Sequence, residues 1–224
     1  MSRTLSQLIY SRIQTESTSP RIITLHKYNQ RAGDVAEYGI AASPTGRVIG
    51  LESFKGVFVG KEITGYTWFL GPYDRPSPLF FGDALAEIEK FLWDEIDRQD
   101  GPDAELPFLV GVEQGAIIAL AAAAAVPDLL SGVIAIGGSL PIVPGWSPPL
   151  APLENLPILV IDTPETPAAN DHVLAGESLA DTLRSWGGNV TTAQAGKDEV
   201  PAKTMSEWVS TQPIRYQMAD VATS

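Results

Sequence analysis

Glu113 stands between two glycines in the segment LPFLVGVEQGAIIALAAAAA, which joins a run of branched apolar residues to a run of alanines. Gly111 and Gly115 would allow the chain to turn sharply from a strand into a closely packed helix. Such a turn lifts the central side chain above the edge of a sheet, at the amino end of the helix. A carboxylate in that place can attack a substrate, accept a proton, or simply form an ion pair. The residue types alone leave all three uses open.

The elements around this turn alternate between strands and helices. Branched apolar runs predict buried strands at residues 21–25, 48–51, 108–112, 132–136 and 158–161, and a last strand at 189–194. Amphipathic or apolar stretches predict helices at residues 34–42, 83–98, 114–125, 172–186 and 202–209. This alternation predicts the α/β class, with a mostly parallel, doubly wound sheet flanked by helices. Residues 5–16 can add an antiparallel edge strand, whereas residues 211–224 lack periodicity and are expected to fray.

Two proline- and glycine-rich connections interrupt this order, at residues 71–78 and 141–157. In an open α/β sheet, ligands bind beyond the carboxyl ends of the strands, where long loops surround them. These two connections are therefore candidate walls of a cleft. Trp68, just before the first connection, and Trp146, within the second, are expected to line it, although an aromatic core is the alternative for Trp68.

The composition of the chain excludes several function classes. Its 224 residues include 15 Lys and Arg against 27 Asp and Glu, a net charge of −12 that disfavours binding to nucleic acid or anionic lipid. The absence of cysteine excludes disulfides and thiol nucleophiles. No signal-peptide pattern or membrane-spanning apolar run is found, so we expect a single cytoplasmic domain with its core at about residues 20–210. The acidic residues lack the spacing of a metal site, and no metal or cofactor is expected.

Several segments resemble the carboxylesterase/lysophospholipase family of α/β hydrolases, which includes proteins like the acyl-protein thioesterases. ITLHKYNQ is similar to the family's LHGxGQ loop, GYTWF to an aromatic turn, LENLPILVIDTPETP to the strand that ends in HGxxD, and AGKDEVP to the GGHxxP turn. Gly111, Glu113 and Gly115 occupy the family's GxSxG frame. The order and spacing of these segments agree over roughly residues 20 to 210. The resemblance implies the α/β-hydrolase fold.

The resemblance also implies which residues hold the catalytic positions. Glu113 stands where the family has its nucleophilic serine, Glu165 at the acid position and Lys197 at the position of the general base, so the triad is substituted. Lysine is a poor base, because its ammonium, with a reference pKa of about 10.4, must first lose a proton, and a nearby carboxylate opposes that loss. We therefore expect a Glu113–Lys197 ion pair, with a solvated Lys197 as the alternative.

Further residues are placed around the cleft by the same resemblance. His26 falls where the family has a structural histidine beside its oxyanion loop, and Lys27 brings a cation close to the former oxyanion hole and to Glu113. Gln114 would contribute its backbone amide, and His172 could approach from the helix after the acid position. The residues predicted to contact a ligand are His26, Lys27, Trp68, Gln114, Trp146 and His172.

These substitutions leave three hypotheses about function. The first is a non-hydrolytic, carboxylesterase-like protein that binds a small, partly apolar molecule in the former active-site cleft. The second is an enzyme of altered chemistry that uses Glu113 as nucleophile or general base of a hydrolase, an isomerase or a lyase. The third is a structural partner subunit that uses an exposed sheet edge or aromatic loops. A homodimer is compatible with all three, since similar esterases often pair.

Overall fold

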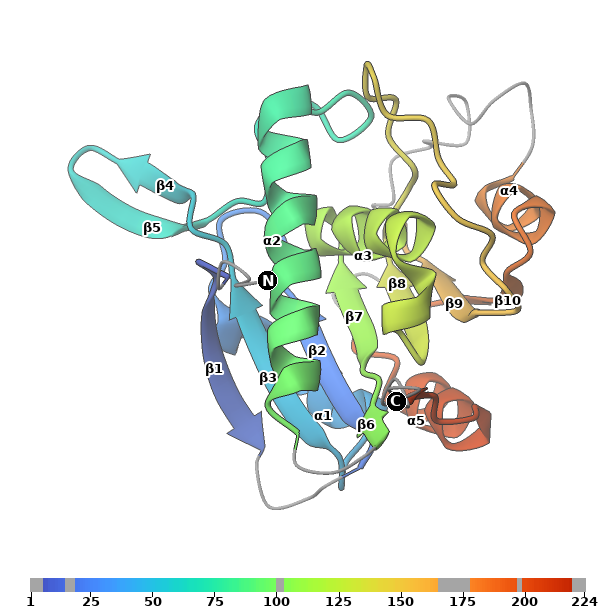
Figure 1. The fold of residues 1–224 in the computed structure, drawn as a ribbon. Helices are drawn as coiled ribbons and strands as arrows, with labels where there is room; N and C mark the ends of the chain where they lie inside the picture. The colour runs from blue at the N-terminus through green and yellow to red at the C-terminus, as the bar shows by residue number, and fades with distance from the viewer. Residues whose placement is uncertain (1–5, 15–18, 100–102, 165–177, 197–198, 219–224) are drawn as a thin grey trace, which may run out of the picture.

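The computed structural model describes residues 6–14, 19–99, 103–164, 178–196 and 199–218 of the chain. Its centre is a seven-stranded sheet with the strand order β1-β3-β2-β7-β8-β9-β10 (Figure 1). The strands are β1 (Ile9–Gln14), β2 (Arg21–Leu25), β3 (Arg47–Glu52), β7 (Phe108–Val112), β8 (Gly132–Ile136), β9 (Pro157–Asp162) and β10 (Asn189–Gln194). Neighbours pair in parallel, except that β1 is antiparallel to β3. The predicted α/β class and the antiparallel edge strand are therefore confirmed.

The central strands have the bounds that the sequence predicts. β7 and β8 carry the sequences FLVGV and GVIAI, and every residue in both is buried. Because helices cover both faces of a parallel sheet, its central strands need apolar side chains at every position rather than at alternate ones. This requirement makes such strands readable from sequence as short, continuous apolar runs.

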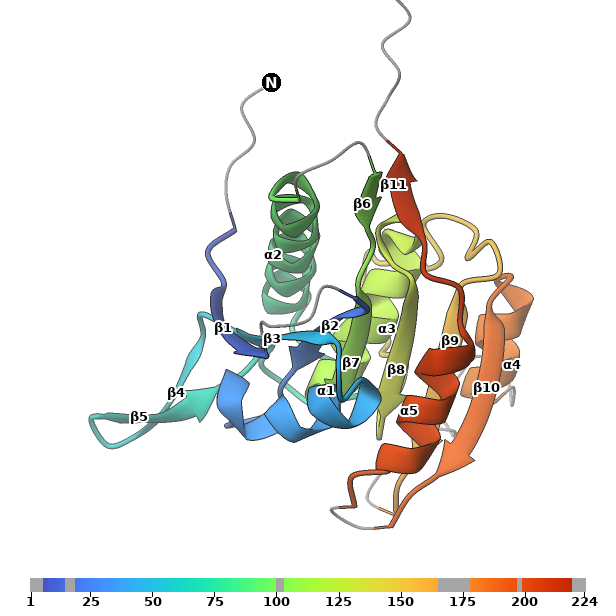
Figure 2. The ribbon, with the colours of Figure 1, turned by 90° about the horizontal axis from the view of Figure 1, so that it is seen from below.

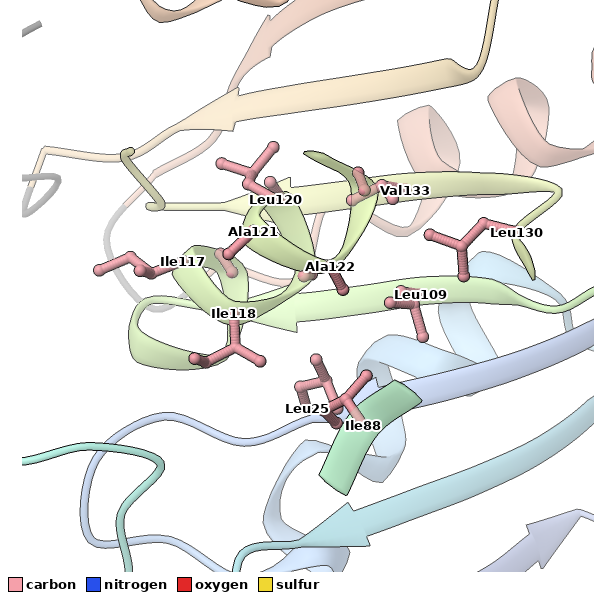
Figure 3. Close-up of a cluster of buried hydrophobic side chains, with 14 of the residues drawn as sticks. Leu25, Ile88, Leu109, Ile117, Ile118, Leu120, Ala121, Ala122, Leu130 and Val133 are labelled. Atoms are coloured by element: carbon pink, nitrogen blue, oxygen red, sulfur yellow. The ribbon is translucent and has the colours of Figure 1, made fainter. Parts of the chain in front are cut away.

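Helices pack on both faces of the sheet (Figures 1 and 2). One face is covered by α2 (Pro78–Asp97), α3 (Gln114–Ala125) and α4 (Leu179–Ser185), the other by α1 (Ala36–Ala42) and α5 (Ala202–Thr211). The apolar side chains between the sheet and the helices α2, α3 and α4 form what we call the first core. Figure 3 shows Ile117 and Ile118 of α3 in this core, with Leu109 of β7 and Ile88 of α2 nearby. α3 is almost entirely apolar because it is buried, packing on β7 and β8 and also against α2. None of the helices in the described ranges is long and apolar enough to span a bilayer.

Two helices differ from the predicted ranges. α2 begins at Pro78, five residues before the predicted start at residue 83, because proline fits the first helical turn, where its missing N–H is not needed. The predicted helix at residues 34–42 is a 3-10 turn, η1 (Ala32–Val35), that continues into α1. Of the predicted helix at 172–186, α4 is described, while residues 172–177 lie outside the described ranges.

Two small sheets were not predicted. β4 (Gly56–Val59) and β5 (Glu62–Tyr66) form an antiparallel hairpin, and β6 (Asp103–Glu105) pairs with β11 (Tyr216–Met218). The second pair differs from the expectation that residues 211–224 fray. Pairing of so short a strand rests on backbone hydrogen bonds, for example from Leu106 N to Arg215 O at 2.9 Å. It does not require a periodic pattern of apolar residues in the sequence. Residues 219–224 lie outside the described ranges.

Candidate functional site

Glu113 occupies the sharp turn between β7 and α3. Its backbone has φ 48° and ψ −107°, a region that non-glycine residues rarely adopt and that costs about 1–3 kcal/mol. A β carbon on Gly111 would lie 2.3 Å from the carbonyl oxygen of Gly115, and one on Gly115 would lie 2.2 Å from that of Leu25. Only glycine fits at either position. The two glycines thus let α3 pack directly on the sheet, and the turn presents the Glu113 side chain at the carboxyl edge of the strands.

The Glu113 carboxylate has two described partners. Nζ of Lys27, from the loop after β2, lies 3.5 Å from Oε1 of Glu113, and the two side chains are 30% and 37% exposed. The hydroxyl of Tyr73, in the connection at residues 71–78, lies near enough to the carboxylate to feel its charge. Burial, followed by the negative charge of Glu113 and the nearby Tyr28, raises the pKa of Tyr73 to about 12. The phenol therefore stays protonated and remains a hydrogen-bond donor at neutral pH.

A small hollow lies beside Glu113. Its volume is about 20 Å³, enough for about one water molecule. The described residues that line it are Lys27, Tyr38, Val112, Glu113, Ile136, Thr163, Gly196 and Glu199. Two carboxylates, those of Glu113 and Glu199, thus meet the Lys27 cation and apolar side chains around one partly open hollow. No group of three or more metal-binding side chains occurs in the described part of the chain.

His26 is buried beneath this site. Its Nδ1 donates to the backbone oxygen of Lys27 at 2.7 Å, its Nε2 accepts from the backbone N–H of Ser53 at 3.2 Å, and its ring stacks on Trp68 with the centroids 4.9 Å apart. Both ring nitrogens are therefore used within the protein. Burial lowers the pKa of His26 to about 4. The structure thus differs from the expectation that His26 contacts a ligand, and the ring instead shapes the loop that carries Lys27.

The buried, neutral His26 predicts a loss of stability in weak acid. Its pKa is near 6.5 in the unfolded chain and about 4 in the folded one, so the unfolded state binds more protons as the pH falls through this window. We expect the His26 contribution to fall by about 2 kcal/mol between pH 7 and pH 5. Urea unfolding at both values measures the difference. The variant His26→Gln should lose less stability than wild type over the same interval, and an equal loss in both proteins would contradict the assignment.

Solved structures place this architecture among known folds. No family model matches the chain, and no curated protein matches it in sequence. The chain is similar to a carboxylesterase from Bacillus cereus, with a TM-score of 0.69 and 15% identity over 92% of this chain and 93% of that one. A carboxylesterase from Mesorhizobium loti gives a TM-score of 0.68 and 16% identity over 85% and 88% of the two chains. A phospholipase/carboxylesterase from Dyadobacter fermentans gives 0.62 and 16% over 94% and 99%.

The chain has the α/β-hydrolase fold. In α/β hydrolases the strand-to-helix turn with flanking glycines carries the nucleophile at the top of the sheet. Glu113 stands at such a turn, with the strained backbone and the close helix packing that the turn requires. At this level of identity the comparison gives the fold alone, so the roles of the residues have to come from their geometry.

The side chains of Trp68 and Gln114 lie inside the α/β-hydrolase core. Trp68 thus takes the core position that was its alternative, whereas the role predicted for the Gln114 backbone amide stays a prediction. Trp68 is fully buried, and its indole N–H donates to the backbone oxygen of His26 at 2.8 Å. The Gln114 side chain accepts from Trp68 N at 2.8 Å and donates to Phe69 O at 3.0 Å. These contacts satisfy polar groups that burial would otherwise leave unpaired. The side chains hold the segment after β5 against α3 and are not available to a ligand.

Trp146 also differs from its expected place. Its ring packs against Phe81 of α2 with the centroids 5.1 Å apart, and it is half-buried on the first core. It is not among the residues around the hollow. The connection at 141–157 instead contacts the other connection, where Ile142 N donates to Asp74 O at 2.8 Å. Packing of the large indole on apolar side chains accounts for this position.

Three predicted site residues cannot be placed. Glu165, His172 and Lys197 lie outside the described residues, so the Glu113–Lys197 ion pair stays a prediction. Lys27 is described and does lie beside Glu113, as expected for the second partner of that carboxylate.

Tyr73 was missed by the sequence analysis. It lies in the connection at residues 71–78, which was expected to form a cleft wall, and it is the residue through which that loop reaches Glu113. An aromatic residue with a hydroxyl in a loop next to the predicted cleft was the available signal. The direction in which the Tyr73 side chain points depends on the path of the loop, and the residue types in the loop do not determine that path.

Proposed function

We propose that this chain is a carboxylesterase-like protein that binds a small, partly apolar molecule at Glu113 without hydrolysing it. The observation that carries the proposal is the arrangement of Glu113 itself. It stands at the turn where the fold places a nucleophile, with the Lys27 ammonium 3.5 Å from its carboxylate and the Tyr73 hydroxyl nearby. A carboxylate in this arrangement can accept a hydrogen bond from a ligand.

The available groups argue against ester hydrolysis of the usual kind. A serine esterase needs a neutral imidazole that takes the hydroxyl proton and later returns it. The chain has two histidines, of which His26 uses both ring nitrogens inside the protein, and His172 lies outside the described residues. The Glu113 side chain has no hydroxyl group to which an acyl group could be transferred, as it is to the serine of an esterase. The α/β-hydrolase frame is therefore proposed to serve binding.

The chemistry of the site suggests what the ligand carries. A carboxylate is an acceptor without donors, so the ligand should present an N–H or O–H group to Glu113. The hollow has room for about one water-sized group. The remaining, apolar part of the ligand would lie over the outer surface, where the Tyr28 ring is exposed in the loop that carries Lys27. A short aliphatic amide or amine meets these conditions.

Ligand-observed NMR titration with butyramide and butyrate tests the proposal. Butyramide, which has an N–H donor, should bind more strongly than butyrate, which has the same shape but is repelled by Glu113. The variant Glu113→Gln should weaken butyramide binding about tenfold, or about 1.4 kcal/mol. Glu207→Gln, at an exposed position on α5, is the control and should bind as wild type does. Equal binding by Glu113→Gln and wild type would refute the proposed site.

One observation favours a second candidate, an enzyme with altered chemistry. Glu113 keeps a strained backbone and a side chain that is 37% exposed, and strain of this kind gathers at active sites. With a carboxylate nucleophile or base, the protein would process a substrate other than a simple ester, or form an ester with Glu113 itself. Measurement of turnover separates this candidate from binding.

A further inference from the structure

The β4–β5 hairpin projects from the body of the molecule in both views (Figures 1 and 2). The chain turns between the two strands at Gly60 and Lys61, with Gly60 at φ 65°, as two-residue hairpin turns require. At its base, Tyr66 N donates to Gln30 O at 3.0 Å and Asn29 N donates to Tyr66 O at 2.9 Å. The base is thus fixed to the loop after β2, while the strands extend into solvent.

A cation fixes the orientation of the hairpin. Nζ of Lys55 lies 3.8 Å from the centroid of the Phe54 ring and 5.7 Å from that of Phe80 on α2. The ammonium is buried, and no hydrogen-bond partner for it occurs in the described part of the chain. The contact with Phe80 connects the base of the hairpin to α2.

The hairpin exposes apolar side chains that the fold does not cover. Phe58 and Val59 on β4 and Ile63 on β5 are 62%, 67% and 41% exposed. Phe58 and Ile63 are directly opposite each other across the two strands, on the same face as Gly56. An isolated two-stranded hairpin is at best marginally stable in water. Exposed apolar side chains gathered on such an element indicate an interaction surface.

The outer edge of β4 is suited to pairing with another strand. Among the described residues, β4 pairs with β5 alone. Natural proteins usually protect a bare edge with lysine, proline or an inward-facing charge. The sequence of β4, Gly-Val-Phe-Val, has none of these. The edge therefore presents free backbone groups beside uncovered apolar side chains.

The distribution of charge indicates what pairs with this edge. The chain carries a net charge of −12, whereas residues 54–66 contain Lys55 and Lys61 against Glu62, a net charge of +1. Two copies of so acidic a chain repel each other over most of their surface. The hairpin lacks this excess of negative charge, so two copies can approach there without that electrostatic repulsion. An uncharged strand also pairs with its own copy without opposing like charges.

We propose that the β4 edge is the interface of a homodimer, in which β4 pairs antiparallel with β4 of a second copy. A two-fold axis perpendicular to the plane of the hairpins relates the two copies, and the two hairpins join into one four-stranded sheet. In this arrangement the same faces of both hairpins lie together, so the two Phe58–Ile63 pairs form one apolar surface across the axis. The interface is distinct from Glu113 and does not depend on the proposed ligand.

Analytical ultracentrifugation tests the dimer directly. Pairing at a hairpin edge buries less accessible surface than the roughly 800 Å² that each partner buries in a tight complex. We therefore expect a dissociation constant in the micromolar range. Wild type should sediment with the mass of two chains at about 100 µM and as one chain on dilution. Phe58→Lys should raise the dissociation constant at least about tenfold, because it adds like charges to the edge. Leu150→Lys, at a similarly exposed site (63%) on the connection at 141–157, should leave it unchanged.

Two results would overturn the proposal. One is a wild-type protein that remains a single chain at about 100 µM, which would assign the hairpin to another partner. The other is a dimer that Phe58→Lys leaves intact while circular dichroism shows both proteins folded.

A spin label provides evidence that does not depend on the lysine variants. The chain has no cysteine, so Val59→Cys and Leu150→Cys each give one labelled site. Paired strands lie about 4.8 Å apart. Labels at Val59 should therefore broaden each other's spectra at concentrations where the dimer forms, and labels at Leu150 should not. Broadening at Leu150 and not at Val59 would place the interface elsewhere.

Discussion

Gly115→Ala is expected to lower the free energy of unfolding by about 3 kcal/mol or more, or to prevent folding. A β carbon at this position would lie 2.2 Å from the carbonyl oxygen of Leu25 at the end of β2, and 2.8 Å from that of His26. Both oxygens belong to the backbone of a packed element, so the clash is relieved only when α3 moves away from the sheet. Because α3 begins directly after Glu113, the same movement would displace the carboxylate. Urea unfolding followed by circular dichroism measures the effect.

Gly82→Ala is the matched control for this substitution. Gly82 lies within α2, and a β carbon there would have no atom within 4 Å. Alanine should therefore stabilise the helix, by about 0.5–1 kcal/mol. The two glycine substitutions are expected to have opposite signs. A loss below about 1 kcal/mol in Gly115→Ala would show that the helix does not approach the sheet as closely as described.

Glu95→Gln is expected to destabilise the protein by about 3 kcal/mol. The Glu95 side chain, near the end of α2, is 2% exposed and lies 2.9 Å from Nη1 of Arg21 and 3.8 Å from Nη2 of Arg47. These arginines begin β2 and β3. Burial and the charge of Arg47 lower the pKa of Arg21, while Glu95 raises it. Without the carboxylate, two partly buried cations remain side by side, which is costlier than the loss of one hydrogen bond.

An exposed ion pair provides the comparison for Glu95. Asp181 and Arg184 on α4 are 2.9 Å apart, about the same distance as Glu95 and Arg21, but both are open to solvent. Asp181 also accepts a hydrogen bond from the N-cap residue Ser178, but solvent screens its charge, so Asp181→Asn should lower the free energy of unfolding much less than Glu95→Gln does. Chemical denaturation of both variants measures the contrast. Equal effects would mean that burial does not determine the strength of the Glu95 contacts.

Much of the fold could be predicted because burial acts on whole segments. β7 and β8 are covered on both faces, so each is a continuous apolar run whose ends are visible in the sequence. The turn at Glu113 was predictable because both of its glycines have a steric cause. A β carbon on Gly111 would meet the backbone of Gly115, and one on Gly115 would meet the backbone of Leu25 in β2. The β4–β5 hairpin was missed even though Gly60 and Lys61 lie between two short apolar stretches, since its strands bury no continuous face.

The candidate site was harder to predict because side-chain direction depends on distant neighbours. His26, Trp68 and Gln114 were placed around a cleft, with a structural histidine, an aromatic core and a backbone amide as the respective considerations. Their side chains instead form a buried network of contacts that joins the end of β2, the segment after β5 and α3. Nothing in any one segment specifies such a network. The position of Tyr73 depends likewise on the path of its loop. By contrast, Lys27 directly follows the histidine at the end of β2, and its place near Glu113 was predicted from the resemblance of this loop to the family's oxyanion loop.

Turnover of p-nitrophenyl acetate and butyrate tests the central claim that Glu113 binds rather than reacts. Purified wild-type protein is compared with Glu113→Ala under identical conditions, and thermal unfolding confirms that the variant is folded. Our account predicts no turnover by wild type above that of the variant. Turnover by wild type that disappears in Glu113→Ala would contradict it and would make the carboxylate a catalytic group.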